Sequence, residues 1–244
     1  LSIWPGPLGE KIRQLALMPL ANHPGEAWEY GMNTDVLGYL VEVLSGVPLN
    51  TFLADKIFKP LGMKDTHFYL PPEKVQRLAA VYSPGENSEL RALGGEEIRE
   101  GTLIYSVDYP YDGPQTYYSG GGGLCSTAND YYRFAQMMLN SGEWQGTRLL
   151  GRKTVGLMTS HGIGDLEVAP GVGFGLGFSV ITDRGLARSV WSNGSYAWGG
   201  FFYTAFQIDP QEELIAIFLC QLRPNNHLQL DQKVIQLAAQ SIID

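Results

Sequence analysis

The apolar run at residues 214–220 (LIAIFLC) constrains the fold of this chain more than any other segment. It follows Asp209-Pro210-Gln211-Glu212, a turn sequence that predicts a hairpin with the preceding strand. A strand that is continuously apolar, rather than alternating, is usually buried on both faces in the middle of a sheet. As the last strand of a simple meander it would instead present an apolar open edge, which favours aggregation. The run therefore predicts that a further strand, from elsewhere, pairs with it.

The order of the expected elements indicates an α+β protein, with helices first, an antiparallel sheet next and a covering helix last. Periodicity and Gly or Pro stops predict helices at 8–17, 34–45, 49–58, 128–139 and 153–159, strands at 174–181, 188–191, 201–208 and 214–222, and a last helix at 228–243. Residues 71–118 have little periodicity, and irregular regions of this length usually form walls or lids of sites. We expect a single domain over residues 1–244, with a mainly helical lobe and irregular wall over 1–170 and the sheet with its helix over 171–244.

Composition argues against several classes of function. The net charge of −8 disfavours nucleic acid and anionic membrane surfaces as partners. No apolar run approaches the ~20 residues that a membrane span needs. Cys125 and Cys220 fit no metal or redox spacing and the histidines are scattered, so neither a metal site nor a cofactor is expected. Compartment and oligomeric state are left open.

Four segments of the chain carry motif-like sequences. They are WEYGMNTDVLG at 28–38, PLGMKDT at 60–66, SGGGGLCSTAND at 119–130 and WGG at 198–200. In this order and spacing they resemble the serine β-lactamase-like superfamily, which includes class C β-lactamases, family VIII carboxylesterases and D-aminopeptidases. The resemblance implies a β-lactamase/transpeptidase-like fold, in which a helical lobe adjoins an antiparallel sheet covered by a C-terminal helix.

The first motif of that superfamily, Ser-x-x-Lys at the start of a helix, has no counterpart here. No serine of the chain is followed three positions later by lysine, and no G-x-S-x-G sequence occurs. The superfamily places Ser-x-x-Lys further upstream of the tyrosine motif than the residues before Tyr30 allow. We therefore expect an upstream segment, or a second chain, to carry the nucleophile, so that the domain is N-terminally incomplete. The alternative is a family member that has lost this segment.

By resemblance, Tyr30 is the catalytic residue that acts with the base. A phenol has a pKa near 10 and is a poor base at neutral pH unless a nearby cation favours the phenolate. In the superfamily the lysine of the first motif contributes that charge. Class C enzymes place an asparagine two residues after the tyrosine, where this chain has Met32, and Asn33 comes one position later. Asn33 is expected to cap a helix that begins at Thr34, with a catalytic role as the alternative.

The third motif, Lys-Thr-Gly in many members, is replaced by Trp198-Gly199-Gly200 at the start of an expected strand. Lysine and threonine would hold a substrate carboxylate, whereas tryptophan offers an apolar wall and the glycines leave room beside the strand. By resemblance, the backbone N–H of Phe201 is an oxyanion donor. The motif could instead be a β-bulge without function. Candidates for the pocket wall, with plain packing as the alternative, are Tyr117, Tyr118, Trp191 and Tyr196.

These features predict a metal-free, penicillin-binding-protein-like serine hydrolase that forms an acyl-enzyme, with short acyl esters or related amides as small-molecule substrates. The WGG form resembles the family VIII esterases and favours esters. A β-lactamase or D-aminopeptidase is the alternative among enzymes. A non-catalytic binding or scaffold protein is the alternative outside them.

Overall fold

The computed structural model describes residues 6–85, 89–95, 97–100, 103–224 and 229–243. The chain divides into two compact units. The described residues of 1–21, 29–127 and 221–224 form the first unit, and those of 22–28, 128–220 and 225–244 form the second. Residues 128–170 thus group with the sheet rather than with the helical lobe, because the helix at 128–139 packs against the sheet.

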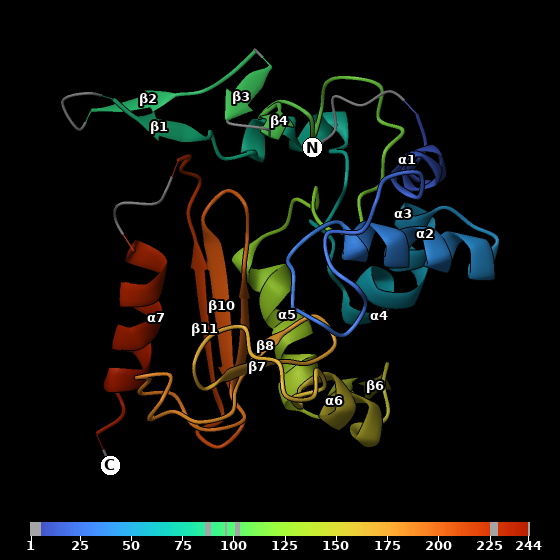
Figure 1. The fold of residues 1–244 in the computed structure, drawn as a ribbon. Coiled ribbons are helices and arrows are strands. Elements are labelled where there is room, and N and C mark those ends of the chain that lie inside the picture. Colours follow the sequence, from blue (N-terminus) through green and yellow to red (C-terminus); the bar gives the residue numbers. More distant parts are fainter. Residues whose placement is uncertain (1–5, 86–88, 96, 101–102, 225–228, 244) are drawn as a thin grey trace. The chain divides into compact units, whose positions relative to one another are not determined.

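The first unit consists of short helices and two small hairpins (Figure 1). Its helical elements are α1 (Leu8–Leu15), α2 (Asn33–Ser45), α3 (Leu49–Leu53), the π-helical η1 (Ala54–Phe58), α4 (Lys59–Leu61) and the 3-10 helix η2 (Pro72–Arg77). Gly46 ends α2 in the left-handed conformation (φ 74°), which glycine adopts without steric cost. The region expected to be irregular contains the antiparallel hairpins β1 (Tyr82–Pro84) with β2 (Leu90–Ala92) and β3 (Ile98–Glu100) with β4 (Leu103–Tyr105).

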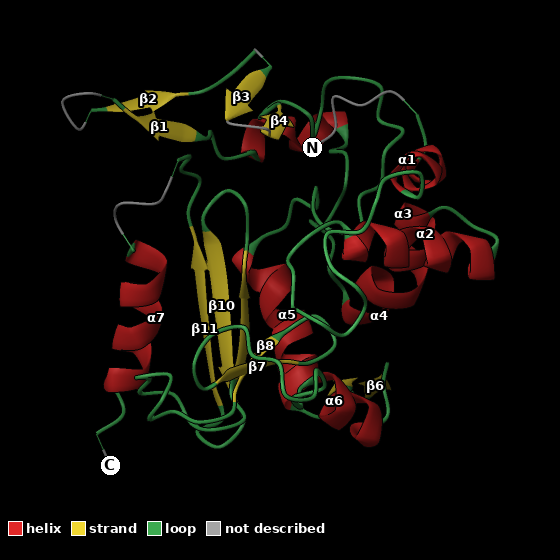
Figure 2. Cartoon of the chain, viewed as in Figure 1, coloured by secondary structure: helices red, strands yellow, loops and turns green. Residues whose placement is uncertain are grey.

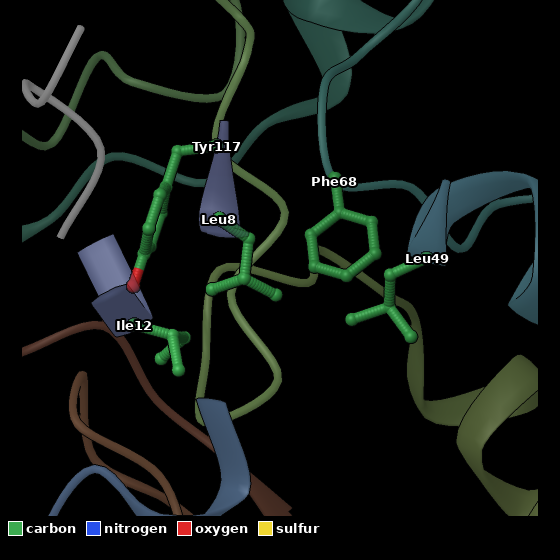
Figure 3. Packing of buried hydrophobic residues seen from close by; sticks show 5 residues of the cluster. All are labelled: Leu8, Ile12, Leu49, Phe68 and Tyr117. Carbon is green, nitrogen blue, oxygen red and sulfur yellow. The ribbon is translucent and has the colours of Figure 1, made fainter. Parts of the chain in front are cut away.

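An apolar core joins these segments (Figure 3). Leu8 and Ile12 lie one turn apart on α1 and therefore share one face of the helix. They are buried together with Leu49 of α3, Phe68 and Tyr117. Tyr117 comes just before the glycine run, so this core ties the glycine run to the helices of the first unit.

Helix α2 leaves much of its apolar surface exposed. Leu37, Leu40, Val43 and Leu44 are all exposed. Among the described residues no single helix is long and apolar enough to cross a membrane. Only α2 and the helical segment Leu49–Leu61 together reach that length and hydropathy, as a pair bent by 81°. An exposed apolar face of this kind is typical of a surface that another segment covers.

The second unit is a five-stranded antiparallel sheet with a helix on each face (Figure 2). The strands lie in the order β11 (Leu214–Leu219), β10 (Thr204–Asp209), β9 (Tyr196–Gly199), β8 (Ser179–Ile181) and β7 (Val172–Phe174). On one face Tyr131 of α5 (Ala128–Leu139) contacts Phe206 of β10, with 5.1 Å between the ring centroids. On the other face, Ile235 of α7 (Leu230–Gln240) packs with Ala216 of β11. The strand register places Ala216 on the opposite face of the sheet from Phe206. The unit also holds α6 (Arg152–Met158) and the hairpin of β5 (Glu143–Trp144) with β6 (Thr147–Arg148).

The prediction of a strand at residues 188–191 was wrong, because polar side chains hold the chain around it in turns. The Asp183 carboxylate accepts hydrogen bonds from the backbone N–H groups of Gly185 and Leu186, at 2.8 and 3.1 Å. Such short side chains offer the backbone an alternative to ladder pairing. Trp191, expected on that strand, is buried instead in the core beneath α7.

Strand β9 was not indicated by the sequence pattern, and this changes the position of the WGG motif. Trp198 and Gly199 lie at the end of β9, and Gly200 begins the turn to β10, so the motif does not start a strand. The segment expected as one strand at 174–181 forms the β7–β8 hairpin. The last helix begins at Leu230, and its expected start at 228 lies outside the described residues.

Strand β11 lies at one edge of the sheet. It pairs with β10 from Asp209↔Leu214 to Thr204↔Leu219, and in the described part of the chain no strand pairs with its other side. The apolar run at 214–220 therefore occupies the edge position that the sequence argued against, and its second neighbour stays a prediction.

Candidate active site

Tyr30 lies immediately before α2, where its side chain is 68% exposed. The helix begins at Asn33 rather than at Thr34, and Met32 occupies the N-cap position without a side-chain cap hydrogen bond. The expected cap at Asn33 is therefore wrong. The Met32 carbonyl accepts from the N–H groups of Asp35 and Val36, at 3.0 and 3.1 Å, so backbone bonds hold the start of the helix beside Tyr30.

A buried carboxylate anchors this start of α2. Asp35 is 6% exposed and accepts hydrogen bonds from the hydroxyls of Tyr117 (3.0 Å) and Ser119 (2.6 Å). The Ser119 oxygen in turn accepts from the N–H of Gly121 at 3.1 Å. Burial, and then the charge of Asp35 and its hydrogen bond, raise the pKa of the Tyr117 phenol, which therefore stays a neutral donor. Asp35 thus fixes the helix that follows Tyr30 to the glycine run.

The glycine run owes its composition to close backbone approach. A Cβ on Gly120 would lie 2.0 Å from the carbonyl oxygen of Thr34 and 3.2 Å from the Cα of Gly38, both in α2. A Cβ on Gly121 would lie 2.7 Å from a carboxylate oxygen of Asp35. No side chain fits at Gly120, so this motif packs directly on the helix that begins after Tyr30.

In the second unit, the end of β9 is paired on one side only. Its ladder with β8 ends at Ser179↔Ala197, whereas its ladder with β10 continues to Gly199↔Ala205. Gly199 is exposed, its φ lies outside the left-handed region, and a Cβ there would meet only one carbonyl oxygen, at 3.5 Å. A side chain would thus fit at Gly199, and its absence leaves the strand backbone open to approach.

A tight turn follows the motif. The Gly200 N–H donates to the Thr204 carbonyl at 2.7 Å, and the Tyr203 N–H donates to the Gly200 carbonyl at 3.1 Å. A Cβ on Gly200 would lie 2.1 Å from the Thr204 hydroxyl oxygen. Phe201 occupies the second position of this turn, and its ring packs edge-on against Phe202 at 5.0 Å. Its role as an oxyanion donor stays a prediction.

The four expected wall residues do not form one surface within either unit. Tyr117 lies in the core of the first unit, and Trp191 lies in the core beneath α7. Tyr196 is 1% exposed and packs edge-on against Phe178, and burial raises the pKa of its phenol. Among the four only Tyr118 keeps a partly exposed ring, which contacts Phe68 at 5.4 Å.

The sequence did not single out two residues that the structure brings to Trp198. Trp28 lies 6.3 Å and Phe174 5.2 Å from its ring, and 5.3 Å separates Trp28 from Phe174. Trp28 stands two residues before Tyr30, and this position in the tyrosine motif was a signal in the sequence that it lies near the site. The contact with Phe174 could not be predicted, because it depends on the pairing of the strands. In the described ranges, no group of three or more His, Cys, Asp or Glu side chains is placed to hold a metal ion.

The sequence is similar to known proteins over nearly its whole length. The beta-lactamase family model matches residues 5–240. Protein Rv1367c of Mycobacterium tuberculosis is 33% identical over 226 residues, which cover 88% of this chain and 53% of that protein. Esterase EstB of Burkholderia gladioli is 30% identical over 207 residues, covering 83% of this chain and 51% of the esterase. The chain thus spans about half the length of these relatives.

The fold is similar to that of solved structures as well. EstCE1, described as a hydrolase with promiscuous acyltransferase activity, superposes with a TM-score of 0.83 at 27% identity. The superposition covers 97% of this chain and 62% of EstCE1. The match to the family model, the motifs at Tyr30, the glycine run and β9, and the helix-covered antiparallel sheet lead to one conclusion. The chain belongs to the beta-lactamase family, with the β-lactamase/transpeptidase-like fold.

Proposed function

We propose that the full-length protein is a serine hydrolase that forms an acyl-enzyme and acts on esters or related amides. The observation that supports this most directly is the end of β9, where Gly199 exposes strand backbone beside the ring of Trp198. A carbonyl substrate needs such an open strand edge in order to reach backbone N–H donors.

In the proposed mechanism a serine from a Ser-x-x-Lys segment outside these residues attacks the ester carbonyl. Its proton passes through a base assisted by Tyr30 to the departing alcohol, and water then cleaves the acyl-enzyme to acid and free serine. The N–H of Phe201 stabilises the oxyanion in both steps. A strand from outside these residues would also pair with the open edge of β11.

The preference for esters over carboxylate-bearing β-lactams or peptides rests on charge. Residues 172–181 and 189–222, which contain all five strands of the sheet, include no Lys, Arg or His. The WGG motif also lacks the ammonium and hydroxyl of Lys-Thr-Gly, so a carboxylate there would lose its hydration without gaining a partner. The similarity to EstB and EstCE1 supports the same preference.

Labelling of the full-length protein with a fluorophosphonate tests the mechanism, because only an activated serine reacts. We expect labelling at the serine of Ser-x-x-Lys, its loss in the Ser→Ala variant, and faster hydrolysis of p-nitrophenyl butyrate than of a chromogenic cephalosporin. A folded protein that is never labelled would support the non-catalytic alternative. Dominant cephalosporin hydrolysis would support the β-lactamase alternative.

The Gly199→Ala variant tests the role of β9. We expect the fold to be kept, because the Cβ has room, and kcat/KM for p-nitrophenyl butyrate to fall roughly tenfold to a hundredfold as the methyl group displaces the ester. Gly156→Ala is the matched control, since a Cβ at Gly156 in α6 meets nothing within 4 Å. Unchanged ester hydrolysis in Gly199→Ala would contradict substrate approach at this strand.

A further inference from the structure

We infer that Trp28, Phe174 and Trp198, here called the aromatic trio, form the subsite that binds the apolar substituent of the substrate ester. This rests on the proposed function and goes beyond it, because it names the chemical class that the site selects. An aromatic or extended aliphatic substituent is favoured, and a carboxylate-bearing one is rejected.

The trio brings together three separate parts of the second unit. Trp28 ends the segment at 22–28, Phe174 ends β7, and Trp198 lies on β9. The ring pairs are tilted or edge-to-face, with interplanar angles of 55°, 70° and 78°. Arrangements of this kind are among those that aromatic rings prefer. The three rings therefore form one contiguous apolar cluster in this structure.

The position of the trio in the sheet distinguishes it from a core cluster. Tyr196 and Phe206 lie on the same sheet face as Trp198, since Tyr196 is two residues earlier on β9 and Phe206 is its register partner. Both are buried, and Phe206 is covered by Tyr131 of α5. Trp198, Trp28 and Phe174 are each only partly buried. The apolar face of the sheet therefore reaches the surface at Trp198, where the rings of Trp28 and Phe174 contact it.

The neighbouring backbone connects this surface to the proposed chemistry. Directly after Trp198 the strand exposes Gly199, where no side chain stands between solvent and the backbone. An ester whose carbonyl lies on this strand end can place a substituent on the rings of the trio. Ring faces attract apolar groups and cations, whereas a carboxylate on them is desolvated without a partner.

Selectivity along a series of esters tests this inference in the full-length protein. One series varies the acyl chain from acetyl to decanoyl with p-nitrophenol constant, and a second varies the alcohol from methyl to octyl with butyrate constant. A buried methylene contributes about fourfold to kcat/KM, and a half-covered one about twofold. We expect kcat/KM to rise with length in one of the two series, which also assigns the trio to the acyl or the alcohol side.

Substitutions in the trio separate recognition from structural support. Trp28→Ala should flatten the length dependence of that series, Trp28→Phe should restore most of it, and Trp198→Lys should raise the relative rate for a carboxylate-bearing ester. Trp144→Ala is the matched control, because Trp144 is also partly buried and packs edge-on against Tyr132 at 5.9 Å in the same unit. It should leave the length dependence unchanged.

The outcomes distinguish this inference from the proposed function. If the full-length protein is not labelled by the fluorophosphonate and hydrolyses no ester, the proposed function fails. If it hydrolyses esters but Trp28→Ala lowers kcat/KM for all chain lengths by the same factor, the trio only supports the fold and the inference is overturned. A wild-type rate that does not depend on chain length in either series overturns it as well.

Discussion

Removal of the Asp35 carboxylate should destabilise the first unit strongly. In Asp35→Ala the buried hydroxyls of Tyr117 and Ser119 lose their acceptor. A buried donor without a partner costs about 1–3 kcal/mol, so two together cost about 2–6 kcal/mol of unfolding free energy. That is a large part of the ~5–15 kcal/mol that stabilises a typical domain. Asp35→Asn should cost less, because both bonds go to the same carboxylate oxygen, Oδ1, and an amide oxygen in its place has two lone pairs to accept them.

Urea unfolding of the full-length protein, followed by circular dichroism, measures this effect. Asp55→Ala is the control, since Asp55 pairs with Lys59 at 2.6 Å in an exposed ion pair that contributes at most ~0.5 kcal/mol. Tyr117→Phe removes one of the two hydroxyl donors that lose their acceptor in Asp35→Ala. In a protein that already carries Tyr117→Phe, Asp35→Ala should therefore cost about 1–3 kcal/mol less unfolding free energy than in the wild type. Equal midpoints for Asp35→Ala and Asp55→Ala would refute the reasoning.

Three further changes have expected outcomes. Tyr196→Phe should leave the unfolding free energy unchanged or raise it slightly, because this buried hydroxyl has no hydrogen-bond partner in the described structure, and a loss above ~1 kcal/mol in urea titration would contradict this. Gly120→Ala should lower the thermal midpoint by several degrees, because its Cβ would meet α2 backbone at 2.0 Å, and an unchanged midpoint in calorimetry would refute the packing argument. The hydrogen bond from Arg77 lowers the pKa of Asp65, so the stability of this ion pair is present above the unfolded pKa of about 4 and is lost as pH falls below it. Asp65→Asn should therefore reduce the acid dependence of stability below about pH 4, and identical pH profiles for mutant and wild type would contradict the assignment.

Local signals in the sequence predicted most of the elements, and residues distant in sequence decided the rest. The turn Asp209-Pro210-Gln211-Glu212 predicted the β10–β11 hairpin, and the Asp209 carboxylate does accept from the N–H groups of Gln211 and Glu212. The burial of Asp35 could not be predicted from the sequence, because its hydroxyl partners lie more than 80 residues further along the chain. An acidic residue in the first turn of a helix also has a sufficient local explanation in the helix dipole, so nothing in the pattern pointed to burial.

The glycines of the motifs show how structure separates packing from function. In the sequence Gly120, Gly199 and Gly200 are equivalent, since each belongs to a motif that resembles the superfamily. At Gly120 the backbone of α2 excludes any side chain, and at Gly200 a Cβ would collide with the Thr204 hydroxyl. At Gly199 neither the backbone conformation nor a close neighbour requires glycine. Glycine in a strand costs about 0.5–1 kcal/mol relative to alanine, so Gly199 is not explained by packing or backbone conformation. The proposed approach of a substrate to this strand end accounts for it.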